Sequence, residues 1–290
     1  MPLPHLSRLL PGLILALGLA GPASAEGAMP HKNLRVCKDP NNMPFANLKG
    51  EGFEDRIAEL FGRKLGVEVE YFTFPQRLGF IRNTLRHKVP GQDYPCDIVL
   101  GVPAGWGQVD STRPYYRSTY VMVFSPERSD LGAVQTEDDF LKLPQAKLDG
   151  LKIGIFDRSP GSAWVAHHGL VESGVPYKSM NPNPDEYPGQ IVERDLADGK
   201  IDVAVVWGPV GAYFAKRVTT TELRVVPLVS EEGVRFDYAI SMGVRRGEPE
   251  WKARVEQFLD ESQAEIAAIL DDYGVPTMAL DEASGAPNGR

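Results

Sequence analysis

A short loop near the amino end of the chain holds residues whose types suit ligand binding. The loop spans residues 39–45 and follows a β-prone run at 34–37. Pro40 ends that run because proline lacks an amide donor, and Asn41 and Asn42 add side-chain amides. Open α/β sheets bind ligands where such a polar loop leaves a strand and enters a helix. An ordinary strand-to-helix connection has the same pattern, so the loop alone leaves both interpretations open.

Aromatic side chains fall in or beside the other loops that are expected to face a cleft. Trp and Tyr suit an apolar small molecule or a segment of a protein partner. Packing between two lobes is the alternative for each ring. The predicted cleft residues are Asp39, Asn41, Asn42, Phe45, Trp106, Tyr115, Tyr116, Arg158, Ser162, Trp164 and Trp207.

A second loop suggests an anion site. Arg158 precedes Gly161 and Ser162, where a helix is expected to begin. Backbone amides at a helix N-terminus attract negative charge. An arginine that only lies on the surface beside a helix start is the alternative interpretation.

The first residues predict export. Residues 13–20 form a short apolar core, and Ala23-Ser24-Ala25 is a small-x-small cleavage site. This pattern indicates a signal peptide over residues 1–25, cleaved after Ala25, and a location in the periplasm. No later stretch approaches the length that spans a bilayer, so no membrane insertion is expected. The net charge of −8 and the lack of a Lys/Arg-rich block exclude nucleic acid as a plausible partner.

Two cysteines, Cys37 and Cys96, are present in a chain whose compartment permits disulfides. Linking them would close a long loop and stabilise the fold by up to about 4 kcal/mol. Two buried free thiols are the alternative, because a bond requires Cα atoms within about 7 Å. A metal site is not expected, since two thiols without a nearby histidine pair lack the ligand spacing that zinc prefers.

The elements that position these residues alternate between strand and helix. Apolar spacing predicts a helix over 53–65, ended by Gly66, and a second helix over 76–88. Strands are predicted at 67–73 and 96–101. A strand–helix–strand order of this kind implies right-handed parallel crossovers with helices on both faces.

Two strands without helices behind them, at 119–124 and 236–244, are interpreted as connectors between two lobes. A second strand–helix unit lies between them. The predicted organisation is a signal peptide at 1–25, lobe 1 at 26–122 and 241–275, lobe 2 at 123–240, and a flexible tail at 276–290.

This pattern covers residues 33–275 and contains these segments in order: 34–37 (LRVC), 39–45 (DPNNMPF), 50–54 (GEGFE), 75–77 (PQR), 96–99 (CDIV), 102–103 (VP), 112–120 (TRPYYRSTY) and 205–209 (VVWGP). It resembles the periplasmic binding protein-like accessory ("J") proteins of PQQ-dependent methanol and alcohol dehydrogenase systems. The resemblance implies an α/β, two-lobe periplasmic binding protein-like fold (type II) with two hinge strands and a central cleft.

The resemblance also implies a function. The implied function is that of an accessory protein in the periplasm, which is non-catalytic and has no cofactor of its own. The expected partner is a PQQ-dependent methanol or alcohol dehydrogenase, its assembly intermediate or its cytochrome, bound through an aromatic-lined cleft. The alternative is a solute-binding protein of an ABC transporter for a small apolar or anionic ligand.

Two further functions known among binding-protein-like chains are less favoured. Amino-acid carriers hold the ligand carboxylate with an arginine after the third strand and the amine with an acid in the second lobe. Here residues 103–108 contain no arginine, and Trp207 stands where the acid would be. Some related chains are dehydratases that use acids in the cleft, a role open to Asp39 or Asp157. The sequence contains no Gly-x-Ser-x-Gly, P-loop or His-Glu-x-x-His motif, so no enzyme is predicted.

Overall fold

The computed structural model describes residue 1 and residues 30–280, except residues 77–78, 129, 180, 182 and 184. The predicted signal peptide and its cleavage site after Ala25 therefore lie outside the described residues, apart from Met1. None of the helices in the described part of the chain is long and apolar enough to cross a bilayer.

The strands form one continuous sheet and a separate two-stranded ribbon. The ribbon belongs to the loop at 39–45 and pairs β2 with β3. The strands are β1 (Leu34–Lys38), β2 (Asn41–Asn42), β3 (Ala46–Asn47), β4 (Val69–Thr73), β5 (Ile98–Pro103), β6 (Asp110–Ser111), β7 (Tyr116–Phe124), β8 (Ile153–Phe156), β9 (Gly174–Tyr177), β10 (Val203–Trp207), β11 (Arg224–Pro227), β12 (Asp237–Val244) and β13 (Thr277–Met278).

Helices cover both halves of this sheet. A single 3-10 turn at Val171–Ser173 and a π-helical segment at Ile191–Leu196 accompany them. The α-helices are α1 (Phe53–Leu65), α2 (Phe80–Asn83), α3 (Glu137–Leu141), α4 (Gln145–Leu148), α5 (Pro160–His167), α6 (Gly208–Ala215), α7 (Pro249–Glu261) and α8 (Gln263–Asp272).

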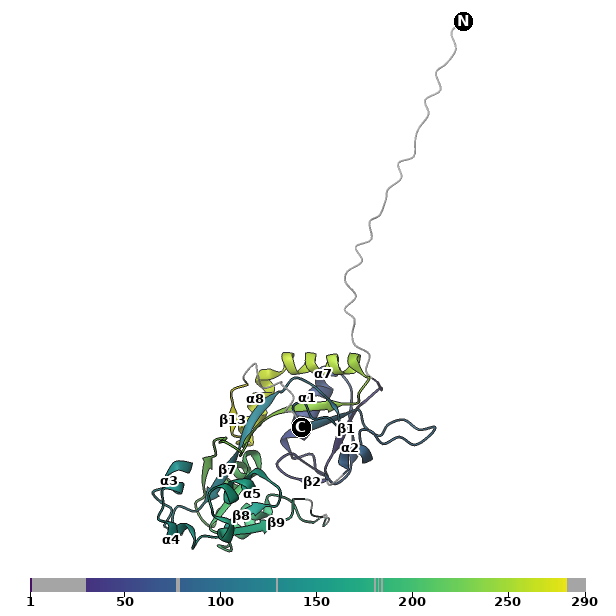
Figure 1. Ribbon diagram of the computed structural model, residues 1–290. Coiled ribbons are helices and arrows are strands. Elements are labelled where there is room, and N and C mark those ends of the chain that lie inside the picture. The colour runs from purple at the N-terminus through teal and green to yellow at the C-terminus, as the bar shows by residue number, and fades with distance from the viewer. Residues whose placement is uncertain are drawn as a thin grey trace.

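The sheet runs through two lobes in the strand order β4-β1-β5-β12-β7-β10-β8-β9. β1 is parallel to β4 and β5 in lobe 1, and β8 is parallel to β9 and β10 in lobe 2. β7 belongs to both lobes: Thr119 pairs with Asp237 of β12, and Tyr120 pairs with Trp207 of β10. Figure 1 shows α1, α7 and α8 around one half of the sheet and α3, α4 and α5 around the other. The two-lobe α/β architecture predicted from the sequence is confirmed, whereas the residue ranges assigned to the lobes remain a prediction.

Helix α1 matches its predicted bounds because its signals are local. The apolar stripe, which includes Phe53, Ile57 and Phe61, is buried in the core of lobe 1. Asp55 accepts a hydrogen bond from the backbone N of Gly52 (3.0 Å) and so caps the first turn. Gly66 ends the helix in the left-handed conformation (φ 71°).

Three predictions of local structure need correction. The helix expected over 76–88 is reduced to α2, because Gly79 has a left-handed φ of 85° and Thr84 leaves the helical region. The flexible tail expected from residue 276 is wrong for its first residues, since β13 pairs with β7 and Ser118 Oγ donates to the carbonyl of Pro276 (2.7 Å). Helix α6 was not predicted. All of its residues are buried, so it has no polar face that would give a helical period.

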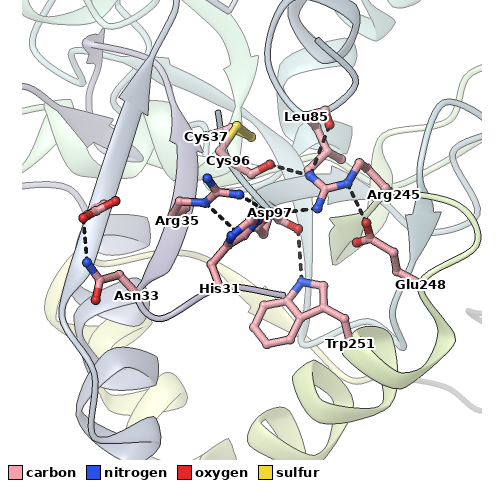
Figure 2. Close-up of polar contacts among 11 residues, drawn as sticks. His31, Asn33, Arg35, Cys37, Leu85, Cys96, Asp97, Arg245, Glu248 and Trp251 are labelled. Carbon is pink, nitrogen blue, oxygen red and sulfur yellow. Dashed lines mark hydrogen bonds and ion pairs between the residues drawn. A yellow bond between two sulfur atoms is a disulfide. The ribbon is translucent and has the colours of Figure 1, made fainter. Parts of the chain in front are cut away.

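A disulfide and a cluster of charges fix the end of lobe 1 that lies at the start of β5. Cys37 and Cys96 are bonded with their Cα atoms 5.4 Å apart, which confirms the predicted pair. Figure 2 shows the side chain of Asp97 between two arginines: Arg35 Nε lies 2.9 Å from Oδ2 and Arg245 Nη2 lies 2.7 Å from Oδ1. The Asp97 carbonyl accepts a hydrogen bond from Trp251 Nε1 (3.1 Å), so the same residue also anchors α7.

Candidate binding cleft between the lobes

A cavity of about 440 Å³ lies between the lobes, at the carboxyl ends of β1, β5, β8 and β10. This position is the one at which open parallel sheets bind ligands. Its volume falls within the usual range for small-molecule sites. The lining residues are Asp39, Asn42, Phe45, Glu54, Gln76, Gly101, Tyr116, Tyr120, Phe156, Arg158, Ser159, Pro160, Ser179, Pro188, Val206, Trp207, Val210 and Ile240.

The loop after β1 forms a rigid part of the lobe 1 wall. Asp39 is buried, and its carboxylate accepts hydrogen bonds from the backbone N of Asn41 (2.7 Å) and of Gln76. Asn42 Nδ2 donates to Gln76 Oε1 (2.9 Å). These contacts use the carboxylate of Asp39 to hold two loops together, so this group acts mainly in positioning the wall.

Glu54 brings a second carboxylate to the same wall. It is the second residue of α1, and it lines the cavity beside Gly101 of β5. Burial, and then the negative charges of Asp55 and Asp39, raise the pKa of Glu54 from 4.5 to about 8. Within the described residues its carboxylate has no hydrogen-bond partner. Glu54 is therefore a carboxyl group that is mostly protonated at pH 7 and available to a ligand.

Aromatic rings supply much of the remaining wall. Phe45 packs against Phe53, with ring centroids 5.2 Å apart, and Trp207 packs against Tyr120 at 5.5 Å. Phe45 and Trp207 each contact the cores of both lobes. Burial, together with the charge of Glu54, raises the pKa of Tyr116 well above its usual value, so its hydroxyl stays protonated.

Lobe 2 contributes the loop that leads into α5. Ser159 caps the helix by accepting a hydrogen bond from Ser162 N, and its own hydroxyl donates to the carbonyl of Phe156 (2.6 Å). Arg158 has a left-handed φ of 55°, an uncommon conformation for a residue with a side chain. Its side chain is 80% exposed and lies 3.9 Å from Asp157. The guanidinium is thus on the rim of the cavity, directed toward solvent.

The structure brings six of the predicted cleft residues together on this cavity. They are Asp39, Asn42, Phe45, Tyr116, Arg158 and Trp207. The others lie elsewhere: Asn41 lines a separate cavity beside Met43, Trp106 packs against the buried cluster that includes the disulfide, and Tyr115 packs against the lobe 1 core. Ser162 donates its hydroxyl to the Ser159 carbonyl (2.7 Å) and does not line the cavity.

Trp164 is the clearest correction among the predicted residues. It is fully buried in the core of lobe 2, and its Nε1 donates to Glu137 Oε1 (2.7 Å). Side chains three or four residues apart share one face of a helix, and position 164 of α5 falls on the face that packs into the lobe 2 core. This tryptophan therefore has a structural role and is not a cleft residue.

Glu54 is the main lining residue that sequence reasoning did not select. An acidic residue in the first turn of a helix is usually explained by the helix dipole. The available signal was its position directly after the 39–45 loop, in the segment Gly50-Glu51-Gly52-Phe53-Glu54. In the described part of the chain, no group of three or more His, Cys, Asp or Glu side chains could hold a metal ion.

Comparisons with known proteins now identify the fold family. No family model matches the chain. The crystal structure of the periplasmic binding protein XoxJ from Methylobacterium extorquens AM1 is 35% identical, with a TM-score of 0.67, and the match covers 85% of this chain and 100% of that one. The chain belongs to the periplasmic binding protein family of XoxJ. The resemblance predicted from the sequence is thereby confirmed.

Two further relatives agree with this assignment. Protein MoxJ from Paracoccus denitrificans is 28% identical over 277 residues, which cover 91% of this chain and 94% of that protein. The crystal structure of MxaJ from Methlophaga aminisulfidivorans MPT is 24% identical with a TM-score of 0.68, and the match covers 85% of this chain and 100% of that one. The last match supports the fold alone. Membership in this family of binding proteins implies a periplasmic location.

Proposed function

We propose that this XoxJ-family protein is a non-catalytic accessory protein of a PQQ-dependent methanol or alcohol dehydrogenase system. Its partner is the dehydrogenase, an assembly intermediate of that enzyme or its cytochrome. The observation that carries the proposal is the similarity to XoxJ and MoxJ over most of the chain. The aromatic rim of the cleft is the proposed contact surface.

The composition of the cleft supports a protein partner over an amino acid. Trp207 lies where amino-acid carriers place an acid, and it packs against both lobes. The two lobes contact each other directly, because Tyr213 of α6 stacks on Tyr273 with ring centroids 5.8 Å apart and an interplanar angle of 13°. A cleft held by such contacts presents a fixed surface, which favours docking without a large conformational change.

Affinity purification tests the proposal. The tagged protein is expressed in methanol-grown cells of a strain that lacks the native copy, and co-purifying proteins are identified by mass. We expect the quinoprotein dehydrogenase or its cytochrome among them, and a lower yield of active dehydrogenase in the deletion strain. Absence of both effects would contradict the accessory role.

Two tryptophan variants locate the contact surface. Trp207→Ala removes a ring on the cavity wall, whereas Trp106→Ala removes a ring that packs against a separate buried cluster in lobe 1. Both rings are partly buried, so the two variants lose comparable packing. We expect Trp207→Ala to reduce recovery of the partner at least tenfold and Trp106→Ala to leave it unchanged. Equal recovery with both variants would exclude the cleft as the contact surface.

A solute-binding role is the second candidate. It is favoured by the 440 Å³ cavity, which both lobes line. A ligand that binds at a concentration 100-fold above its Kd adds about 2.7 kcal/mol to stability, which a thermal shift assay detects. An unchanged melting temperature with alcohols, organic acids and amines would count against this candidate.

A further inference from the structure

The cleft combines a carboxyl group that lacks a partner with a wall of aromatic rings. Glu54 lines the cavity beside Gly101, and its carboxylate has no hydrogen-bond partner in the described part of the chain. Phe45, Tyr116 and Trp207 lie on the same cavity. A carboxylate surrounded by aromatic faces is the environment that recognises organic cations, through charge and through cation–π attraction.

Two cationic side chains of this region, Lys38 and Arg158, do not pair with Glu54. Lys38 Nζ lies 2.8 Å from Asp55 Oδ1, donates to the carbonyl of Asn47 (2.8 Å), and stands 3.8 Å above the ring of Tyr71. Lys38 therefore neutralises Asp55 and not Glu54. Across the cavity, the guanidinium of Arg158 is 80% exposed and screened by solvent. When Glu54 is ionised, no side chain in the described part of the chain therefore compensates its negative charge in the cavity.

We propose that this cavity binds a small organic ammonium ion, for which Glu54 supplies the negative charge and the aromatic rings supply the apolar walls. The cavity of about 440 Å³ limits the ligand to a small molecule. The cavity shares Trp207 with the surface proposed to contact a dehydrogenase, but a small ion needs no partner protein to bind. The ligand site therefore goes beyond the accessory function and does not depend on it.

The proposal has a consequence for pH, because Glu54 must lose a proton to pair with a cation. The groups that face it are Asp55 on its own helix, Asp39 on the loop after β1, and the hydroxyls of Tyr115 and Tyr116 on or beside β7. The pKa values of both tyrosines are raised well above 10, so their hydroxyls stay neutral. Titration near pH 8 is therefore assigned to Glu54.

Calorimetry with choline tests this site, because choline keeps its charge at every pH. Glu54 with a pKa of about 8 is only a few per cent ionised at pH 6.5 and mostly ionised at pH 8.5. We expect the apparent affinity to rise about twentyfold between these pH values. At pH 7, titrations in two buffers of different ionisation enthalpy should show release of about one proton per bound choline. Binding that is absent, or that shows neither proton release nor a pH dependence, would overturn the proposal.

Two controls separate charge from shape. The neutral isostere 3,3-dimethyl-1-butanol has the outline of choline without its charge, and we expect it to bind at least tenfold more weakly at pH 8.5. Glu54→Gln should abolish both the binding and its pH dependence, whereas Glu59→Gln, on an exposed part of the same helix, should leave both unchanged. Equal affinity for the two probes, or retained binding by Glu54→Gln, would exclude Glu54 as the counter-ion. Thermal melts of both variants without ligand show whether each is folded.

The outcome of the choline experiment can be distinguished from the outcome of the experiment that tests the accessory role. Calorimetry uses the purified protein alone, and affinity purification measures partner recovery. Choline binding without partner recovery would support the ligand site and contradict the accessory function. Partner recovery without choline binding would support the accessory function and contradict the ligand site.

Discussion

The carboxylate of Glu54 lies against the backbone of Gly101, so closely that a Cβ atom at position 101 would come within 2.1 Å of Glu54 Oε1. Gly101 also has a left-handed φ of 69°. The glycine therefore provides both the backbone conformation and the space in which the Glu54 side chain sits.

Gly101→Ala should destabilise the protein by about 2–4 kcal/mol, because it adds both conformational strain and a clash. The matched control is Gly91→Ala, since Gly91 has a φ of 80° and no atom within 4 Å of an added Cβ. We expect Gly91→Ala to lower the stability by about 1 kcal/mol, because it adds backbone strain but no clash. Urea unfolding of the two variants measures the difference, and equal costs would show that the Glu54 carboxylate is not held firmly in this position.

Stability should fall as pH rises through the range in which Glu54 titrates. Its pKa is about 8 in the folded protein and about 4.5 in the unfolded chain. Between these values the folded state binds the extra proton, so the stabilising effect of the neutral carboxyl is complete below pH 4.5 and is lost by pH 8. Glu54→Gln removes this dependence and should be more stable than the native protein by about 2–4 kcal/mol at pH 9. Denaturant melts from pH 5 to 9 test the prediction, which a constant difference between the proteins would contradict.

Removing the disulfide should cost about 4 kcal/mol. Cys37 and Cys96 are separated by 59 residues, and a loop of that length restricts the unfolded chain strongly. The double variant Cys37→Ser/Cys96→Ser should unfold at a lower urea concentration than the oxidised protein. Reductant should destabilise the native protein and leave the double variant unaffected. A reductant effect on both would point to a cause other than this bond.

Asp97→Asn should cost about 3–5 kcal/mol, because it removes the buried carboxylate that pairs with both Arg245 and Arg35 and leaves the guanidinium of Arg245 with Glu248 alone. Asp260→Asn is the matched control: Asp260 pairs with Arg113 at 2.7 Å, but both side chains are more than half exposed. An exposed pair contributes at most about 1 kcal/mol. Similar unfolding midpoints for the two variants would contradict a stabilising role for the cluster in Figure 2.

Local signals explain which elements the sequence predicts well. Helix α1 has an apolar stripe and a terminal glycine, Gly66, and both lie within the helix itself or directly after it. Helix α6 has neither a polar face nor a cap, because tertiary packing buries every residue from Gly208 to Ala215. The helix packs against β7, which is remote in sequence. It also follows β10 directly, and the apolar residues of β10 and α6 give no signal for where the strand ends and the helix begins.

The same distinction explains the mixed outcome for the cleft. Trp164 and Trp207 have the same side chain, and both lie close to the carboxyl end of a lobe 2 strand. Trp207 ends β10 and points into the cavity, whereas Trp164 lies one turn into α5 and faces the core. Residue type predicts that an aromatic ring is at least partly buried, but the direction of a ring on a helix depends on the face on which its residue falls.

The path of β7 and β12 has a consequence for the order in which the chain can mature. Lobe 2 is assembled from one uninterrupted stretch between these two strands. Lobe 1 is split: its first strands come early, but Arg245 and Trp251, which secure Asp97, follow only after lobe 2. During synthesis, lobe 2 can therefore complete its core while lobe 1 still lacks its carboxyl-terminal segment, which includes α7 and α8. A protein that binds this chain before its synthesis is complete would therefore encounter a folded lobe 2 beside an incomplete lobe 1.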